Sequence, residues 1–202
     1  MCWSKEVSFL TLCIGTFFNY HLWQYPTPMA RPIAGLWQFV MCMQFFEGFS
    51  WVSKEIRSPW LSSFATRGAF LFNTAQPLVA AALFGAYATP TMQKVLGVLC
   101  VLYTGLIVHG TMNRTFRNLY SSTCTHLTLY WWDWFPFALP LFYAIISISF
   151  LSVIPKKLGR FLIGYSGLTL LISLLMYHCS YGSMWCWLVA FAPVATLLFL
   201  RA

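Results

Sequence analysis

Charged residues are scarce in this chain: they make up 8% of its 202 residues, and only four are acidic. Soluble domains contain about 25% charged residues, so the composition excludes an ordinary soluble fold. Hydrophobic residues account for 59% of the sequence, which is more apolar surface than a fold in water can cover. The sequence therefore predicts a multi-pass integral membrane protein whose main partner is the lipid bilayer.

Other absences narrow the function classes. The chain contains no Walker motif, no HExxH, no CxxC and no histidine pair at haem-binding spacing, so neither a cofactor nor a metal is expected. No lysine lies inside the last two apolar runs to hold a retinal Schiff base, which disfavours an opsin. The net charge of +8 is spread over the ends of apolar runs. That placement favours lipid phosphates, and not nucleic acid, as its partners.

The apolar runs predict an all-α fold, a bundle of seven transmembrane helices, with six as the fallback if the first is only interfacial. A crossing helix needs about 20 residues, so these spans fill the chain and residues 1–202 form a single transmembrane domain. The spans are expected at about 7–23, 33–52, 67–87, 93–112, 134–154, 161–177 and 183–200. Residues 53–63 are expected to form a connecting loop.

Basic residues do not orient this bundle. With seven spans, equal numbers of Lys and Arg fall on the two sides: Lys5, Lys54, Arg57, Arg67, Arg114 and Arg117 against Arg31, Lys94, Lys156, Lys157, Arg160 and Arg201. The positive-inside rule needs an asymmetry to give a direction. The orientation is therefore left open, although the two termini are expected on opposite sides.

A carboxylate, Glu47, lies inside the second expected span. A charge at bilayer depth costs about 2.5 to 3.5 kcal/mol on insertion scales. Gln44 lies three residues earlier and is a neighbour on the same helix face. The third span carries Asn73 and Gln76, and Pro77 deprives the Asn73 carbonyl of its helical partner. Because a short loop makes these spans neighbours, we predict a polar cluster of Gln44, Glu47, Asn73 and Gln76.

This cluster has two explanations. It can hold helices together by hydrogen bonds, with Glu47 protonated or paired to Arg67 or Lys54. Alternatively, it is a binding site for a proton, a cation or a substrate on a path through the bundle. Carboxylates inside membranes often have such functional roles, so both readings stay open.

A second group of polar residues is expected at headgroup level: His126, Asp133 and His178. A cavity that joins them would indicate a lipid-modifying enzyme, although no nucleophile or oxyanion donor can be assigned beside them. Cys179 and Cys186 flank a short loop, and the sequence does not decide whether they pair.

Three motifs carry a resemblance to known proteins: Met43-Gln44-x-x-Glu47-x-x-x-Trp51, Gln76-Pro77 and Ser183-Met184-Trp185-Cys186-Trp187. Together they resemble a group of small seven-span membrane proteins associated with giant viruses and single-celled eukaryotes. The resemblance implies a topology and supplies no mechanism. A weaker likeness, to cytochrome oxidase subunit III, rests on Gly48-Phe49-Ser50-Trp51 and Phe72-Asn73-Thr74. These segments fall one helix earlier than in that family, and its later histidine-rich segment is missing.

The function expected from these features is that of a small channel or transporter-like protein, with Glu47 as its proton- or cation-sensitive group. One rival is a structural or assembly subunit that binds other membrane subunits or itself. The stripe Gly97, Val101, Gly105 and Val108 would let another helix approach closely. The second rival is the lipid-modifying enzyme. Whether the protein is an enzyme is therefore undecided, and a function without catalysis is favoured.

Overall fold

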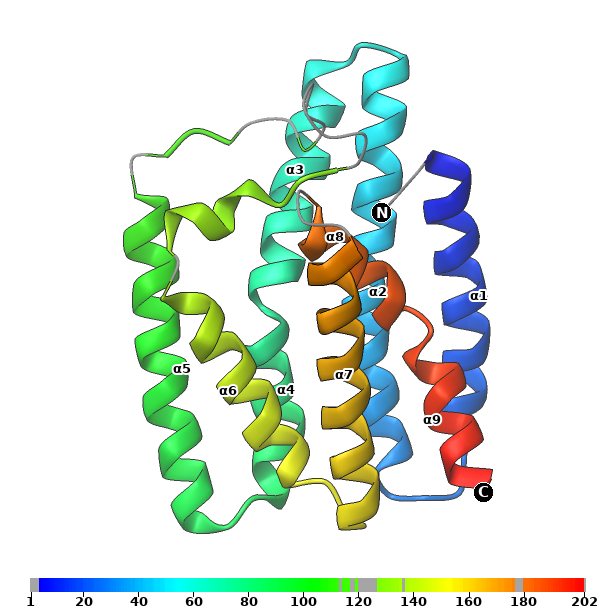
Figure 1. Ribbon diagram of the computed structural model, residues 1–202, viewed down its shortest axis with the longest axis vertical. Helices are drawn as coiled ribbons and strands as arrows, with labels where there is room; N and C mark the ends of the chain where they lie inside the picture. The colour runs from blue at the N-terminus through cyan, green and yellow to red at the C-terminus, as the bar shows by residue number, and fades with distance from the viewer. Residues whose placement is uncertain are drawn as a thin grey trace.

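The structure, a computed structural model, describes residues 4–112, 114–116, 119, 127–135, 137–176 and 180–201. Every regular element in these ranges is a helix (Figure 1). The elements are α1 Lys5–Trp23, α2 Ala30–Glu55, α3 Pro59–Thr74, α4 Gln76–Phe84, η1 Gly85–Tyr87, α5 Pro90–Thr111, η2 Tyr130–Trp134, α6 Ala138–Leu151, α7 Lys156–Met176, α8 Tyr181–Val189 and α9 Ala192–Arg201. The predicted all-α class is therefore confirmed for the described residues.

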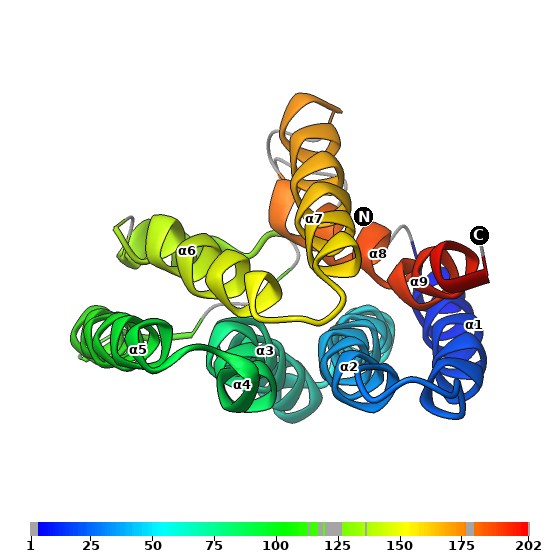
Figure 2. The same ribbon diagram turned by 90° about the horizontal axis from the view of Figure 1, so that it is seen from below.

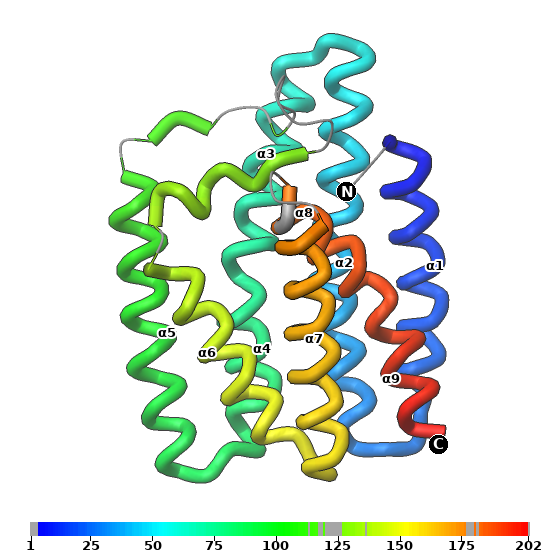
Figure 3. Tube along the Cα trace, in the orientation of Figure 1, coloured from blue at the N-terminus to red at the C-terminus, as the bar shows by residue number. Residues whose placement is uncertain are grey.

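The helices form two layers. Seen along the bundle, α5, α3 with α4, α2 and α1 stand side by side in one layer, and α6, α7 and α8 with α9 form the other (Figure 2). Contacts between α4 and α6, and between α1 and α9, join the layers. The trace runs up and down the long axis, and α9 ends near the bottom of the view, whereas α1 begins in its upper half (Figure 3).

Aromatic side chains are the largest members of the apolar core. The largest side chains with almost no exposed surface include Trp131, Tyr103, Phe84, Phe142 and Phe150. They come from η2, α5, α4 and α6, so the core is continuous across the two layers. Apolar burial of this kind stabilises a fold in water. In lipid, the same side chains act mainly through close packing.

Some helices have the length and composition of membrane spans. The helices α5, α7 and the segment Gly182–Arg201 are each long and apolar enough to cross a bilayer. The pair α3 and α4, extended to Tyr87, gives a fourth candidate with a bend of 41°. The helix α6 has 14 residues, fewer than the roughly 20 of a straight crossing. These helices support a membrane protein, and the seven-span arrangement remains a prediction.

Residues 53–63, expected as a loop, are mostly helical. The helix α2 continues to Glu55, and α3 begins at Pro59. Ser58 caps α3 by accepting a hydrogen bond from the backbone N–H three residues later, at 3.3 Å, and Thr89 caps α5 in the same way. In both cases a proline occupies the first helical turn, where a missing N–H costs nothing. The charged residues Lys54 and Glu55 therefore belong to the last turn of α2, which extends past its apolar run.

Two of the expected spans are broken helices. The span predicted at 67–87 divides at Ala75 into α3 and α4, because Pro77 cannot donate to the carbonyl four residues earlier. Next to the break, the Tyr103 hydroxyl donates to the Thr74 carbonyl at 2.8 Å. The last span divides in the same manner into α8 and α9, with Pro193 in the first turn of α9.

An exposed ion pair ties the start of α1 to the end of α2. The Lys5 ammonium donates to the Glu55 carboxylate, and Glu6 lies 3.8 Å from the same nitrogen. The hydrogen bond to Glu55 raises the pKa of Lys5 above its ordinary 10.5. A group with a raised pKa stabilises the fold fully below its ordinary pKa, and the stabilisation is lost as the pH rises through the raised value.

We therefore predict a small, pH-dependent stabilisation from Lys5. The melting temperature in detergent should be slightly lower for Lys5→Met than for the wild type at about pH 8. The gap should begin to close above pH 10.5, where Lys5 in the unfolded chain loses its proton, and should vanish once the pH exceeds the raised pKa of the folded protein. Lys94→Met, which changes an exposed lysine at the start of α5, is the control and should show no such closing gap. A constant gap for Lys5→Met up to strongly alkaline pH contradicts the assignment.

Candidate functional site

One face of α2 is buried and polar at its centre. Trp37, Val40, Gln44 and Glu47 are each at most 3% exposed, and Trp51 is half-buried on the same stripe. The spacing of three and four residues places these side chains above one another on the helix. Gln44 Nε2 donates to Glu47 Oε2 at 3.1 Å. The carboxylate therefore has an amide neighbour from its own helix.

The break between α3 and α4 carries the other two predicted residues. Asn73 is 2% exposed and Gln76 is fully buried. Trp131, from η2, donates through its indole N–H to Asn73 Oδ1 at 3.0 Å. The amide nitrogen of Asn73 donates to the Cys186 thiol of α8 at 3.7 Å, a distance normal for a sulfur acceptor.

The Cys186 thiol is the point on which the cluster converges. The Gln76 side chain also lies close to this thiol, and the Glu47 carboxylate is near enough to act on it electrostatically. Cys186 is a free cysteine and is fully buried. The structure thus brings Glu47, Asn73 and Gln76 toward one sulfur atom, between the α2–α4 layer and α8.

Gln76 is a buried member of the cluster in which both side-chain amide atoms lack a hydrogen-bond partner among the described residues. Its side chain faces the thiol, yet neither amide atom has a hydrogen-bond partner of normal geometry among the described residues. A buried amide without partners costs about 1 to 3 kcal/mol. Native structures keep such groups where a functional site or an exchangeable partner explains them.

The basic residues expected as partners of Glu47 lie on the surface. Arg67 is exposed and lines an outer groove with Trp60 and Phe64. Lys54 is also exposed, and its ammonium lies 5.0 Å from the centre of the Trp51 ring. The surroundings of Glu47 described above are amides and a thiol, so the expected pairing with Arg67 is not what the structure shows.

The headgroup-level group is described only in part. Asp133 lies on η2 and is exposed, beside the buried Trp131 and Trp132. His126, His178 and Cys179 lie outside the described residues, so a cavity joining them stays a prediction. Within the described part of the chain, no three His, Cys, Asp or Glu side chains come together to hold a metal ion.

Sequence reasoning missed Trp131 and Cys186 as members of the cluster. The motif Ser183-Met184-Trp185-Cys186-Trp187 contained an indication of how α8 is oriented, because its two tryptophans contact different helices. Trp185 donates to the Ser166 carbonyl of α7 at 3.2 Å, and Trp187 donates to Thr11 of α1 at 3.0 Å. Two anchored indoles fix the rotation of α8, which leaves Cys186 facing α2 and the helix break. Nothing local to Trp131 indicates its contact with Asn73.

No family model, curated protein or solved structure matches this chain. The function is therefore argued from the geometry alone.

Proposed function

We propose that the protein is a multi-pass, seven-span membrane protein that moves protons or small cations, with Glu47 as the group that binds them. The observation that carries the proposal is the cluster itself. A fully buried carboxylate on α2 and the unpartnered amide of Gln76, beside the break between α3 and α4, both lie near the buried Cys186 thiol. Ionisable side chains in such positions mark ion and proton pathways.

The broken helices support the same function. Membrane transporters commonly bind ions where discontinuous helices meet near the middle of the bilayer, because the freed backbone groups and the dipole ends face the site. Here α4 begins at Gln76 and α8 carries Cys186, so two broken spans contribute to one cluster.

Flux measurements in liposomes test the proposal. The purified protein, reconstituted with a pH-sensitive dye inside the vesicles, should dissipate a pH gradient faster than empty vesicles. Glu47→Gln keeps the size and hydrogen-bonding shape but cannot exchange the proton, so its flux should fall to the empty-vesicle rate. Glu6→Gln, which changes an exposed carboxylate at the start of α1, should match the wild type.

The proposal fails if the wild type shows no flux of protons, sodium, potassium or small metabolites above empty vesicles. It also fails if Glu47→Gln conducts as well as the wild type. A separate melting curve of Glu47→Gln in detergent shows whether the variant folds, so lost flux is not confused with lost protein.

An assembly subunit is the second candidate, and the surface of α5 favours it. Val101 is 72% exposed and Val108 is 54% exposed, and a Cβ added at Gly97 or Gly105 would meet nothing within 4 Å. This stripe of α5 is uncovered by the described chain and fits a close-packed neighbouring helix. Gly105→Leu should then lower the oligomeric state in mild detergent, whereas a protein that is monomeric from the start contradicts this role.

A further inference from the structure

The outer groove that runs along α3 is open to the surroundings of the protein. It has a volume of about 490 Å³, within the range of roughly 300 to 1,000 Å³ for small-molecule sites. Trp60, Phe64 and Leu71 line it, and each of them is at least 43% exposed. Large apolar side chains are thus gathered in one place where the described chain leaves them uncovered.

Packing between α2 and α3 holds the walls of the outer groove in place. The Trp60 ring stacks on Phe64, with ring centres 5.8 Å apart. On the α2 side, Phe46 lies against the backbone of α3, because a Cβ at Gly68 would be 2.1 Å from its ring. Phe46 also contacts Phe72, at 5.2 Å between ring centres. The groove is therefore formed before a ligand binds, which lowers the entropic cost of binding.

The polarity of the outer groove changes along its length. Ser63 and Arg67 line the groove, and their spacing of four residues places them above one another on α3. The next position on this face is the apolar Leu71, which is followed by Phe72. The groove thus passes from a polar end to an apolar end along the helix axis. A phospholipid has the same order, because its headgroup is followed by its acyl chains.

The polar end lies at the depth expected for lipid headgroups. The helices α3 and α4, extended to Tyr87, form one of the candidate spans. Arg67 precedes Tyr87 by 20 residues, or about 30 Å along a helix axis, and the bend of 41° makes this separation slightly shorter. The hydrocarbon core of a bilayer is also about 30 Å thick. With Tyr87 at one interface, where aromatic residues gather, Arg67 reaches the other.

The charge of Arg67 selects the kind of headgroup. Among the described residues that line the groove, Arg67 is the one with a charge, and it is exposed. No ion pair or hydrogen bond from the described part of the chain engages its guanidinium, whereas Lys5 is paired with Glu55. A guanidinium donates two parallel hydrogen bonds to a phosphate. Charge complementarity therefore favours a ligand with an anionic phosphate.

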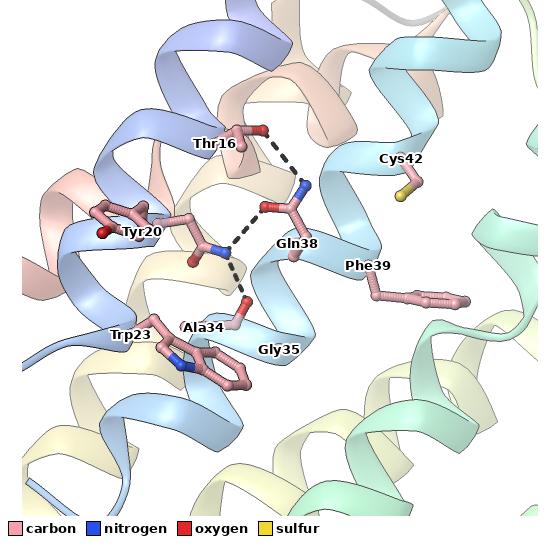
Figure 4. Close-up of a pocket in the computed structure, with 9 residues that line it drawn as sticks. Thr16, Tyr20, Trp23, Ala34, Gly35, Gln38, Phe39 and Cys42 are labelled. Carbon is pink, nitrogen blue, oxygen red and sulfur yellow. Dashed lines mark hydrogen bonds between the residues drawn. The ribbon is translucent and has the colours of Figure 1, made fainter.

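A second groove, between α1 and α2, lacks this charge and serves as a comparison. Figure 4 shows the residues that line it, with Gln38 reaching from α2 toward Thr16 of α1, to which it donates at 3.3 Å. Its volume is about 650 Å³, and none of the described residues that line it is charged. Acyl chains fit either groove, but the walls of the α1–α2 groove cannot distinguish an anionic headgroup from a zwitterionic one.

We propose that the outer groove binds an anionic phospholipid, with its phosphate on Arg67 and Ser63 and one acyl chain along Leu71. A zwitterionic lipid binds less well, because its own cationic group already neutralises the phosphate and is repelled by the guanidinium. The inference rests on the proposed membrane setting and not on ion flux. Lipid binding here and transport at Glu47 can therefore fail independently.

Photocrosslinking with two matched probes tests this site. The full chain is reconstituted in phosphatidylcholine vesicles that contain a trace of phosphatidylglycerol or phosphatidylcholine, each with the same photoreactive acyl chain. Labelled peptides are identified by mass spectrometry. The phosphatidylglycerol probe should label the α3 peptide that contains Phe64 and Leu71 about fivefold more than the phosphatidylcholine probe, the ratio expected for one basic side chain at a membrane surface. The α1–α2 groove should be labelled equally by both.

Three surface variants separate the groove from the general charge of the protein. Arg67→Gln removes the charge, so the preference for phosphatidylglycerol should disappear. Arg67→Lys keeps the charge without the paired donors, so most of the preference should remain. Arg57→Gln removes an exposed basic residue two positions before α3, outside the groove, and should keep the fivefold preference. Melting temperatures show that each variant is folded before labelling is compared.

Three results overturn the proposal. The first is equal labelling of the outer groove by both probes in the wild type, which assigns the groove to the acyl chains of any phospholipid. The second is a preference that survives in Arg67→Gln. The third is an equal loss of preference in Arg57→Gln, which attributes it to the overall positive surface. None of these results depends on whether Glu47 carries protons.

Discussion

Gly159→Ala should be among the most destabilising single-methyl changes in this protein. A Cβ at position 159 would lie 2.2 Å from the Phe150 carbonyl oxygen, a backbone atom that cannot turn aside. The short link between α6 and α7 brings these residues together, so relief requires the two helices to separate. Overpacking in a core costs about 1 to 3 kcal/mol and occasionally more. We expect about 3 kcal/mol, or a fall in melting temperature of roughly 10 °C.

Gly167→Ala provides the matched control on the same helix. A Cβ at position 167 would meet nothing within 4 Å, and the residue is exposed. Alanine has the higher helix propensity by about 1 kcal/mol, so this variant should melt slightly above the wild type. Thermal unfolding in detergent distinguishes the two. Equal melting temperatures for the two variants would show that α6 and α7 do not approach as closely as described.

The sequence predicted the helical class well because its signals are local. Apolar runs of about 20 residues place most helices within a few residues. The prediction of a loop at 53–63 was wrong because the charged residues there were interpreted as the end of the helix, whereas α2 extends to Glu55. Likewise, α1 begins at Lys5, before the apolar run expected from residue 7. In a membrane protein, polarity marks where lipid ends and says less about where a helix ends.

The cluster was predictable only in part. Gln44 and Glu47 share a helix face, and Pro77 marks the break beside Asn73 and Gln76, so helical periodicity indicates these four residues. Trp131 and Cys186 come from segments at least 55 residues further along the chain, and their contacts depend on how the second layer folds over the first. Periodicity carries no information on such long-range packing.

Asn73→Leu tests the contact between Trp131 and this cluster, and it is the second substitution for which we expect a large loss of stability. It deprives the fully buried Trp131 indole N–H of its acceptor, which leaves an unsatisfied donor in an apolar setting. We expect a loss of about 2 to 3 kcal/mol in the free energy of unfolding. Trp131→Phe alone should also destabilise, because it leaves Asn73 Oδ1 without this donor and shrinks a core side chain.

The double variant Asn73→Leu with Trp131→Phe should cost less than the sum of the single changes. Removing both partners of a buried hydrogen bond leaves neither group unsatisfied, so a coupling free energy of about 1 to 2 kcal/mol is expected. Additive losses in denaturant or thermal unfolding would show that this bond does not hold η2 on the helix break.

The same double variant separates the two roles of the cluster. If Asn73 only fastens η2 to the bundle, the double variant should show the proposed proton flux at the wild-type rate per folded protein in liposomes. We expect its flux per folded protein to be low, because Asn73 also donates to the Cys186 thiol, which lies near Glu47 and Gln76. That result would show that the proposed transport depends on the polar environment of the carboxylate, beyond the bonds that hold its helices together.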